Sequence, residues 1–171
     1  LVTLAAVADH ATVKKSYPAL ATAASHAATP QIRNVGTIGG NLCQRPRCWY
    51  YRHEHYECLK KGGSLCYARE GENEFHAIYD NATCNIIHPS NTAPAFIAYG
   101  AIAVVVGGDQ KTKEIPIEDF FLSPEEDIFR ENVLEPNEIL VKVIVPKAAA
   151  SATSAFVEVR EKQSYDWAIC A

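Results

Sequence analysis

The chain has 171 residues, of which 48% are hydrophobic and 21% are charged, and its formal net charge is −4. A chain of this length can bury a core without disulfide or metal staples, and its acidic balance gives no sign of the basic face that nucleic-acid binders present. No apolar run approaches the ~18 residues of a membrane-spanning helix, so we expect neither a nucleic-acid partner nor membrane insertion.

Helices are predicted over the first 30 residues. Thr3 is placed to cap a helix that begins at about Leu4, and a second, alanine-rich helix is predicted within residues 16–28. Pro18 suits the first turn of this second helix. The pair Thr29-Pro30 is expected to end it, because a residue before proline avoids the helical region.

The middle of the chain lacks regular periodicity. A glycine-bearing loop is predicted at residues 34–41, and a polar, aromatic, cysteine-bearing insert follows at residues 43–88. A segment this long without periodic structure is usually functional or disordered. The cysteines favour a functional segment.

The rest of the chain reads as short strands and helices. We predict a helix from about Thr92, a buried strand in "AIAVVVGG", a second strand in "KEIPIEDFF" and an alternating strand from Leu140 to Val145. A linker is expected after Pro146. Because the chain contains no methionine and stops within an apolar run, we expect it to be a piece of a longer protein. The mixed pattern predicts an α+β or α/β domain.

The glycine loop reads "GTIGGN" at residues 36–41. Closely spaced glycines permit positive φ and close backbone approach, and the backbone N–H groups of such a loop can bind a pyrophosphate. The loop matches neither the dinucleotide fingerprint nor a P-loop. A tight turn that requires glycine explains the same pattern.

Six cysteines are present, and four of them, at positions 48, 58, 66 and 84, are separated by gaps of 9, 7 and 17 residues. Structural zinc sites usually pair cysteines in short knuckles, and only Cys43 and Cys48 have such a spacing. A [4Fe–4S] cluster needs four thiolates without strict local spacing. Spacing alone therefore leaves an iron–sulfur cluster, zinc, disulfides and free thiols open. Nearby cationic side chains would stabilise an anionic cluster, although a solvated basic patch explains them equally. Four histidines are further candidate ligands: His53, His55, His76 and His88.

Three stretches in this order, "QIRNVGTIGGNL", "HPSNTAPAFIAYGA" and "LEPNEILVKVIVP", resemble the FAD-binding subunit of xanthine dehydrogenase-family molybdenum hydroxylases. The resemblance covers nearly the whole chain. The combination "GNLCQRPRCWYYR" followed by three more cysteines resembles the subgroup with an extra [4Fe–4S] cluster, like the flavoprotein subunits of periplasmic aldehyde oxidoreductase and 4-hydroxybenzoyl-CoA reductase.

The resemblance implies an α+β fold, the second subdomain of a two-part, PCMH-type FAD-binding domain over residues 1–147, with the cluster in the insert at 43–88. Residues 148–171 would be a linker and the start of a C-terminal α+β domain, and the family's first phosphate-binding segment would lie before residue 1.

The resemblance also implies the site residues. The loop contacting FAD would comprise Gly36, Thr37, Ile38, Gly39, Gly40 and Asn41, with Cys43 beside the flavin ring and further contacts from Asn91 and Leu140. The cluster ligands would be Cys48, Cys58, Cys66 and Cys84. Two departures concern the flavin site: Asn91 stands where Asp is usual, and Glu158 stands where Lys is frequent.

The function implied is an electron-transfer flavoprotein subunit, an FAD-dependent oxidoreductase component without catalytic side chains of its own. Its partners would be a large subunit with a molybdenum cofactor, a small subunit with [2Fe–2S] clusters and an external electron acceptor, in either the cytoplasm or the periplasm. The competing interpretation is a zinc-stabilised binding module without redox activity.

Overall fold

The computed structural model describes residues 1–79, 83–162 and 167–171. The chain divides into two compact units. The first comprises Leu1–Cys43, Ser90–Phe120 and Leu134–Ala171, and the second comprises Gln44–Pro89 and Phe121–Val133. Within these described ranges, no helix is long and apolar enough to cross a membrane.

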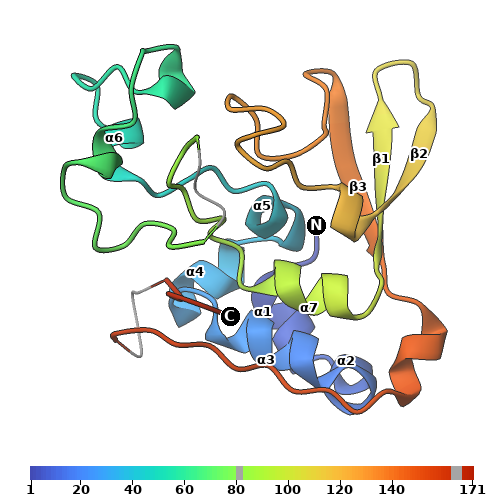
Figure 1. Cartoon of the computed structure of the whole chain (residues 1–171). Helices are drawn as coiled ribbons and strands as arrows, with labels where there is room; N and C mark the ends of the chain where they lie inside the picture. The colour runs from blue at the N-terminus through green and yellow to red at the C-terminus, as the bar shows by residue number, and fades with distance from the viewer. Residues whose placement is uncertain (80–82, 163–166) are drawn as a thin grey trace. The chain divides into compact units, whose positions relative to one another are not determined.

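The first unit contains several short helices (Figure 1): α1 (Leu4–Asp9), α2 (Ala11–Ser16), α3 (Pro18–His26), α4 (Pro30–Val35), α5 (Ile38–Leu42) and α7 (Thr92–Ala98). The predicted start of α1 is confirmed, because the Thr3 side chain accepts the N–H of Ala6 at 3.1 Å. Pro18 occupies the first turn of α3 as predicted. The small alanine side chains of α3 let it pack against α1, α2 and α7.

The Thr29-Pro30 pair ends one helix and also begins another, which the sequence did not predict. Thr29 has an extended backbone, and its hydroxyl accepts the N–H of Ile32 at 3.3 Å, so it caps α4. Pro30 occupies the first turn of α4, where a missing N–H costs nothing. Proline keeps the preceding residue, Thr29, out of the helical region, and this extended conformation is the one that an N-terminal cap of a helix requires.

A three-stranded antiparallel sheet completes the first unit, in the order β2-β1-β3 (Figure 1). The strands are β1 (Ile102–Gly107), β2 (Thr112–Pro116) and β3 (Glu138–Ile144). A register shift between Val104 and Val105 interrupts the pairing of β1 with β3. The strands are antiparallel, and the α-helices of this unit precede them in the chain and do not alternate with them. This arrangement makes the fold α+β.

The core of the first unit joins these helices to the sheet. Its most buried large side chains are Leu20, Leu42, Phe96, Val105, Ile117 and Phe120. After β3, a 3₁₀ helix, Lys147–Ser151, occupies part of the predicted linker. The strands predicted in "AIAVVVGG" and "KEIPIEDFF" correspond to β1 and β2, and the helix predicted from Thr92 corresponds to α7.

The second unit has little regular structure, as the weak periodicity of its sequence predicts. It contains the one-turn helix α6 (Trp49–Arg52) and the 3₁₀ helices η1 (Leu59–Lys61) and η2 (Tyr67–Arg69). A bridge between Cys58 and Leu65 and another between Phe121 and Asn132 close its loops.

Gly36 ends α4 and leaves no room for a side chain. A Cβ atom there would lie 2.9 Å from the carbonyl oxygen of Ile32, a backbone atom that cannot move away cheaply. We expect Gly36→Ala to lower the free energy of unfolding by about 1–3 kcal/mol, the usual cost of overpacking, as measured by urea denaturation.

Gly39→Ala is the matched control, because a Cβ atom there meets nothing closer than the Leu140 carbonyl oxygen at 3.9 Å. Within a helix this change is neutral or stabilising, by up to about 1 kcal/mol. An equal loss of stability in the two variants would contradict the steric argument.

Candidate functional site

The glycine segment is anchored to the first residues of the chain. The N–H of Leu4 donates to the Gly36 carbonyl at 2.9 Å, and the N–H of Ile38 donates to the Val2 carbonyl at 3.0 Å. These bonds enclose a bridge between Thr3 and Thr37. The predicted loop over 34–41 is therefore wrong in detail: the end of α4 and most of α5 replace it, with only the Gly36–Thr37 junction between them.

Thr37 is the residue that turns the chain into α5. Its hydroxyl accepts the N–H of Gly40 at 3.0 Å, and its backbone is extended. The positive-φ glycines among the described residues are Gly62 and Gly100, so the loop glycines do not serve a left-handed turn. Gly39 lies beside β3, since the nearest atom to its Cβ position is the Leu140 carbonyl oxygen at 3.9 Å. The structure thus brings two predicted flavin contacts together.

Asn41 fixes α5 against the start of α7. Its buried Oδ1 atom accepts hydrogen bonds from the hydroxyls of Ser90 at 2.7 Å and Thr92 at 2.6 Å. The Ser90 hydroxyl in turn accepts the N–H of Ala93 at 3.0 Å. Oδ1 of Asn41, a residue predicted to belong to the FAD-contacting loop, is therefore engaged within the protein, and Asn41 holds the segment in place.

Asn91 lies at the N-terminal end of α7 and donates from Nδ2 to Glu158 Oε2 at 2.9 Å. The Glu158 side chain is only 5% exposed and also contacts Arg160, as well as Nδ1 of His26 at 2.9 Å. A second carboxylate at position 91 would face this buried carboxylate directly, which disfavours two ionised groups. The contact explains why this chain tolerates Asn at 91 together with Glu at 158.

Cys43 lies at the end of α5, where its N–H donates to the Gly39 carbonyl at 2.9 Å. Its side chain is partly buried, and this burial raises the pKa of the thiol. Cys43 belongs to the first unit, whereas the four predicted cluster ligands belong to the second.

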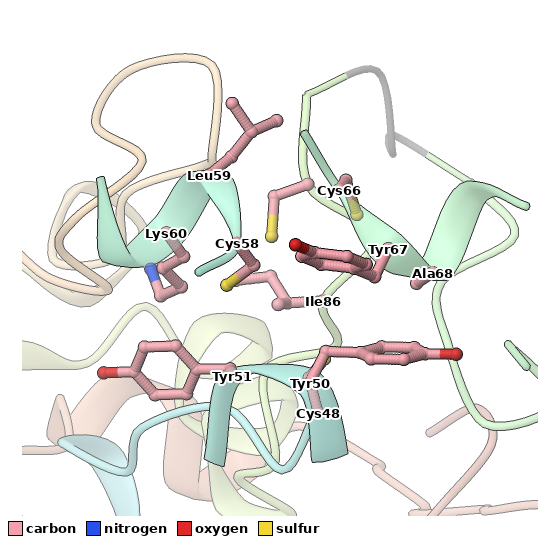
Figure 2. Close-up of a pocket in the computed structure, with 11 residues that line it drawn as sticks. Cys48, Tyr50, Tyr51, Cys58, Leu59, Lys60, Cys66, Tyr67, Ala68 and Ile86 are labelled. Carbon is pink, nitrogen blue, oxygen red and sulfur yellow. The ribbon is translucent and has the colours of Figure 1, made fainter. Parts of the chain in front are cut away.

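The second unit gathers those four ligands around one pocket. Figure 2 shows Cys48, Cys58 and Cys66 arriving from three segments, and Cys84 completes the set. The remaining lining residues are mostly apolar or aromatic: Tyr50, Tyr51, Leu59, Lys60, Tyr67, Ala68 and Ile86. Four thiols that lie far apart in sequence are thus directed to one place.

A tight glycine turn returns the chain from Cys58 to Cys66. Gly62 has φ of 92°, a conformation that favours glycine. A Cβ atom on Gly63 would lie 1.8 Å from the Glu57 carbonyl oxygen, so only glycine fits there. The N–H of Gly63 donates to the Cys58 carbonyl at 3.0 Å.

Burial makes two of these thiols poor acids in the absence of metal. It raises the pKa of Cys84 to about 11, with the neighbouring Cys66 acting in the same direction. Burial likewise raises the pKa of Cys48, while the backbone of Tyr51 and Tyr50 opposes the shift. A metal that binds here must displace the protons and compensate for the buried negative charge.

A buried ion pair fixes the chain beside Cys58. Lys60 Nζ lies 2.6 Å from Glu131 Oε1, and the two side chains are 1% and 8% exposed. Lys60 also donates to the Ile128 carbonyl at 2.8 Å, and Arg45 pairs with the other oxygen of Glu131 at 2.9 Å. The sequence did not reveal this pair, because Glu131 has no local pattern that marks it.

His76, one of the predicted candidate histidines, contacts a cysteine of this pocket. Its Nε2 lies 3.2 Å from Cys48 Sγ, and its ring packs edge-on against Trp49 with centroids 5.0 Å apart. The exposed His53 and His55 contact each other, with ring centroids 5.2 Å apart.

The four cysteines do not form a compact site for one ion. Across the described ranges, no group of three or more His, Cys, Asp or Glu side chains has an arrangement that holds a single metal ion. A zinc ion draws its thiolates together, since each Zn–S bond is only about 2.3 Å long.

The comparisons with known proteins agree with the flavin interpretation. Residues 1–148 match the family model for the FAD binding domain in molybdopterin dehydrogenase. The chain is 33% identical, over 165 residues, to the aldehyde oxidoreductase FAD-binding subunit PaoB of Escherichia coli (strain K12), covering 95% of this chain and 52% of that protein. It is 27% identical, over 164 residues, to the nicotinate dehydrogenase FAD-subunit of Eubacterium barkeri, covering 96% of this chain and 40% of that protein. The chain thus spans about half or less of these relatives.

Solved structures support the fold. Carbon monoxide dehydrogenase from Hydrogenophaga pseudoflava, lacking the Mo-pyranopterin moiety, matches with a TM-score of 0.57 and 24% identity over 98% of this chain and 42% of that one. The cyanide-inactivated Cu,Mo-CO dehydrogenase matches with a TM-score of 0.58 and 19% identity over 97% of this chain and 41% of that one.

These matches define the class of the chain as an FAD-binding domain. The chain belongs to the family of FAD-binding domains found in molybdopterin dehydrogenases. The family resemblance inferred from the sequence is confirmed.

Removing the cation of the buried ion pair tests how the pocket is held. We expect Lys60→Met to lower the free energy of unfolding by about 3 kcal/mol, the lower end of the cost of leaving a buried charge unpaired, because Arg45 still contacts Glu131. Denaturant unfolding followed by tryptophan fluorescence measures the change.

Lys61→Met is the neighbouring control. Lys61 is exposed and donates only to the His53 carbonyl at 2.7 Å among its described contacts, so its loss should cost no more than about 0.5 kcal/mol. If the two methionine variants unfold at the same denaturant concentration, the ion pair does not stabilise the second unit.

Proposed function

We propose that this chain is the flavin-binding part of an electron-transfer subunit in a molybdenum-containing hydroxylase or dehydrogenase. The observation that carries the proposal is the family match over residues 1–148. The subunit would pass electrons between iron–sulfur clusters and FAD, and on to an external acceptor. Residues 1–147 would be the second subdomain of a two-part FAD domain, and residues 148–171 would lead into a C-terminal domain.

The first unit fits the proposed FAD site through its backbone. The Thr37-capped turn presents glycines beside the Leu140 carbonyl, and glycines allow a cofactor to approach the main chain closely. The residues proposed to contact FAD are Gly36, Thr37, Ile38, Gly39, Gly40, Asn91 and Leu140, with Cys43 nearby. Asn41 would act by holding the segment through Ser90 and Thr92.

The second unit fits a [4Fe–4S] cluster held by Cys48, Cys58, Cys66 and Cys84. The donor set is four thiols around one pocket lined mainly by apolar and aromatic groups, and four cysteine thiolates are the usual ligands of such a cluster. When bound, FAD supplies one- or two-electron exchange and the cluster supplies one-electron exchange. The protein's part is to exclude water and to fix the thiols, for which Lys60, Glu131 and the glycine turn are suited.

The proposed partners follow from the family resemblance. Two of the relatives are FAD-binding subunits, one of an aldehyde oxidoreductase and one of a nicotinate dehydrogenase. We propose a large subunit with the molybdenum cofactor and a small subunit with [2Fe–2S] clusters. The alternative, a zinc-stabilised module without redox activity, is less well supported because structural zinc sites usually pair cysteines in short knuckles, whereas the four pocket cysteines are separated by gaps of 9, 7 and 17 residues.

The cluster ligands are tested by iron content. Anaerobically purified protein should carry about four irons per chain, and Cys48→Ser should lower that number sharply, because the serine hydroxyl is a poor replacement for a thiolate. Cys43→Ser is the control and should retain the wild-type iron content. Iron lost from the Cys43 variant, or stoichiometric zinc in the wild type, would overturn this assignment.

The flavin site is tested separately at Gly39. The added methyl group of Gly39→Ala fits the protein itself, yet it would occupy space that the proposed cofactor approaches. We expect FAD affinity to fall about tenfold, which corresponds to ~1.4 kcal/mol, as measured by flavin fluorescence titration of the full-length subunit. Unchanged affinity in the Gly39 variant would place the cofactor elsewhere.

A further inference from the structure

We infer that His76 is a positioning residue that donates a hydrogen bond from Nε2 to the Cys48 sulfur and thereby raises the reduction potential of the cluster. The inference rests on the proposed cluster. It adds a role for a side chain outside the four thiolate ligands.

The contact is short and shielded from water. His76 Nε2 lies 3.2 Å from Cys48 Sγ, and His76 is 8% exposed. Bonds to charged acceptors are stronger than neutral ones, and burial strengthens them further. The pair therefore has the geometry and the surroundings of a bond that influences the electronic state of the sulfur.

The backbone and the neighbouring rings hold the imidazole in this orientation. The N–H of His76 donates to the Asn73 carbonyl, and the N–H of Ala77 donates to the Asn85 carbonyl, both at 3.0 Å. The edge of the ring packs against Trp49. Because Asn85 follows Cys84 in the chain, the same bonds link His76 to a second proposed ligand.

The hydrogen-bonding pattern defines which nitrogen carries the proton. A metal-bound thiolate can only accept a hydrogen bond, so Nε2 must donate. Nδ1 is buried and has no hydrogen-bond partner among the residues that the structure describes, which agrees with a neutral ring whose single proton lies on Nε2. His76 can thus stabilise negative charge on Cys48 without adding a full positive charge.

This bond favours the reduced cluster, because reduction adds negative charge to the sulfurs that accept it. Hydrogen bonds to cluster sulfurs are one of the determinants of potential, and outer contacts of this kind tune a metal site. Removal of the donor should therefore make reduction less favourable while the four ligands remain.

The test uses the full-length subunit, purified anaerobically, in four forms: wild type, His76→Phe, His76→Gln and His53→Phe. Phe keeps the ring without the donor, Gln restores an N–H donor, and His53 is an exposed histidine of the same unit. We expect the equilibrium constant for cluster reduction to fall about tenfold in H76F, which is ~59 mV for a one-electron couple. H76Q should recover part of this loss, and H53F should match the wild type in titrations monitored by electron paramagnetic resonance.

A second measurement does not depend on how the variants fold. In wild-type protein labelled with ¹⁵N-histidine, pulsed electron paramagnetic resonance of the reduced cluster should reveal one weakly coupled histidine nitrogen, as expected for a hydrogen bond. A strong coupling, or iron lost from either His76 variant, would overturn the inference by making His76 a ligand or an assembly residue. No coupling, or equal potentials in H76F and H53F, would overturn it while leaving the cluster in place. Wild-type protein without iron would overturn both proposals.

Discussion

The Oδ1 atom of Asn41 is the acceptor on which the glycine segment depends. Helices as short as α4 and α5 are not stable on their own, because the conformational entropy lost in forming the first turn exceeds the free energy gained from its few hydrogen bonds. Two hydroxyls from Ser90 and Thr92 bind this one oxygen inside the protein, and leaving such groups unsatisfied costs about 1–3 kcal/mol each. The segment therefore keeps its position beside Leu140 through a polar contact with α7, and its glycines are free to lie close to a cofactor.

The second unit achieves order by different means. Its helices are single turns, so backbone ladders contribute little, and the chain is fixed by side chains at a few points. The Lys60–Glu131 pair, the Gly62–Gly63 turn and the packing of Trp49 on His76 each constrain a segment that carries a cysteine. A cluster bound to four thiolates would join these segments further, since metal binding adds its free energy to folding.

Local signals in the sequence were sufficient for part of the fold. The Thr3 cap, Pro18 in a first turn and the apolar run of β1 each act within a few residues, and all three are present in the structure. The helices α2, α4 and α5 were missed because five or six residues are too few for a periodic pattern to emerge. The gathering of the four cysteines followed from family resemblance and not from their spacing. The contacts of Lys60 and His76 were not predictable, because each joins positions that only the folded chain brings together.

The hydrogen bond between Asn91 and Glu158 has a consequence for sequence variation. An acid at position 91 would place a second negative charge beside the buried Glu158 carboxylate, which disfavours ionisation of both groups. The two positions at which the sequence predicts departures from the family pattern, 91 and 158, are therefore in direct contact. Residues 91 and 158 are expected to covary, and a substitution at one of them is interpretable only together with the residue present at the other.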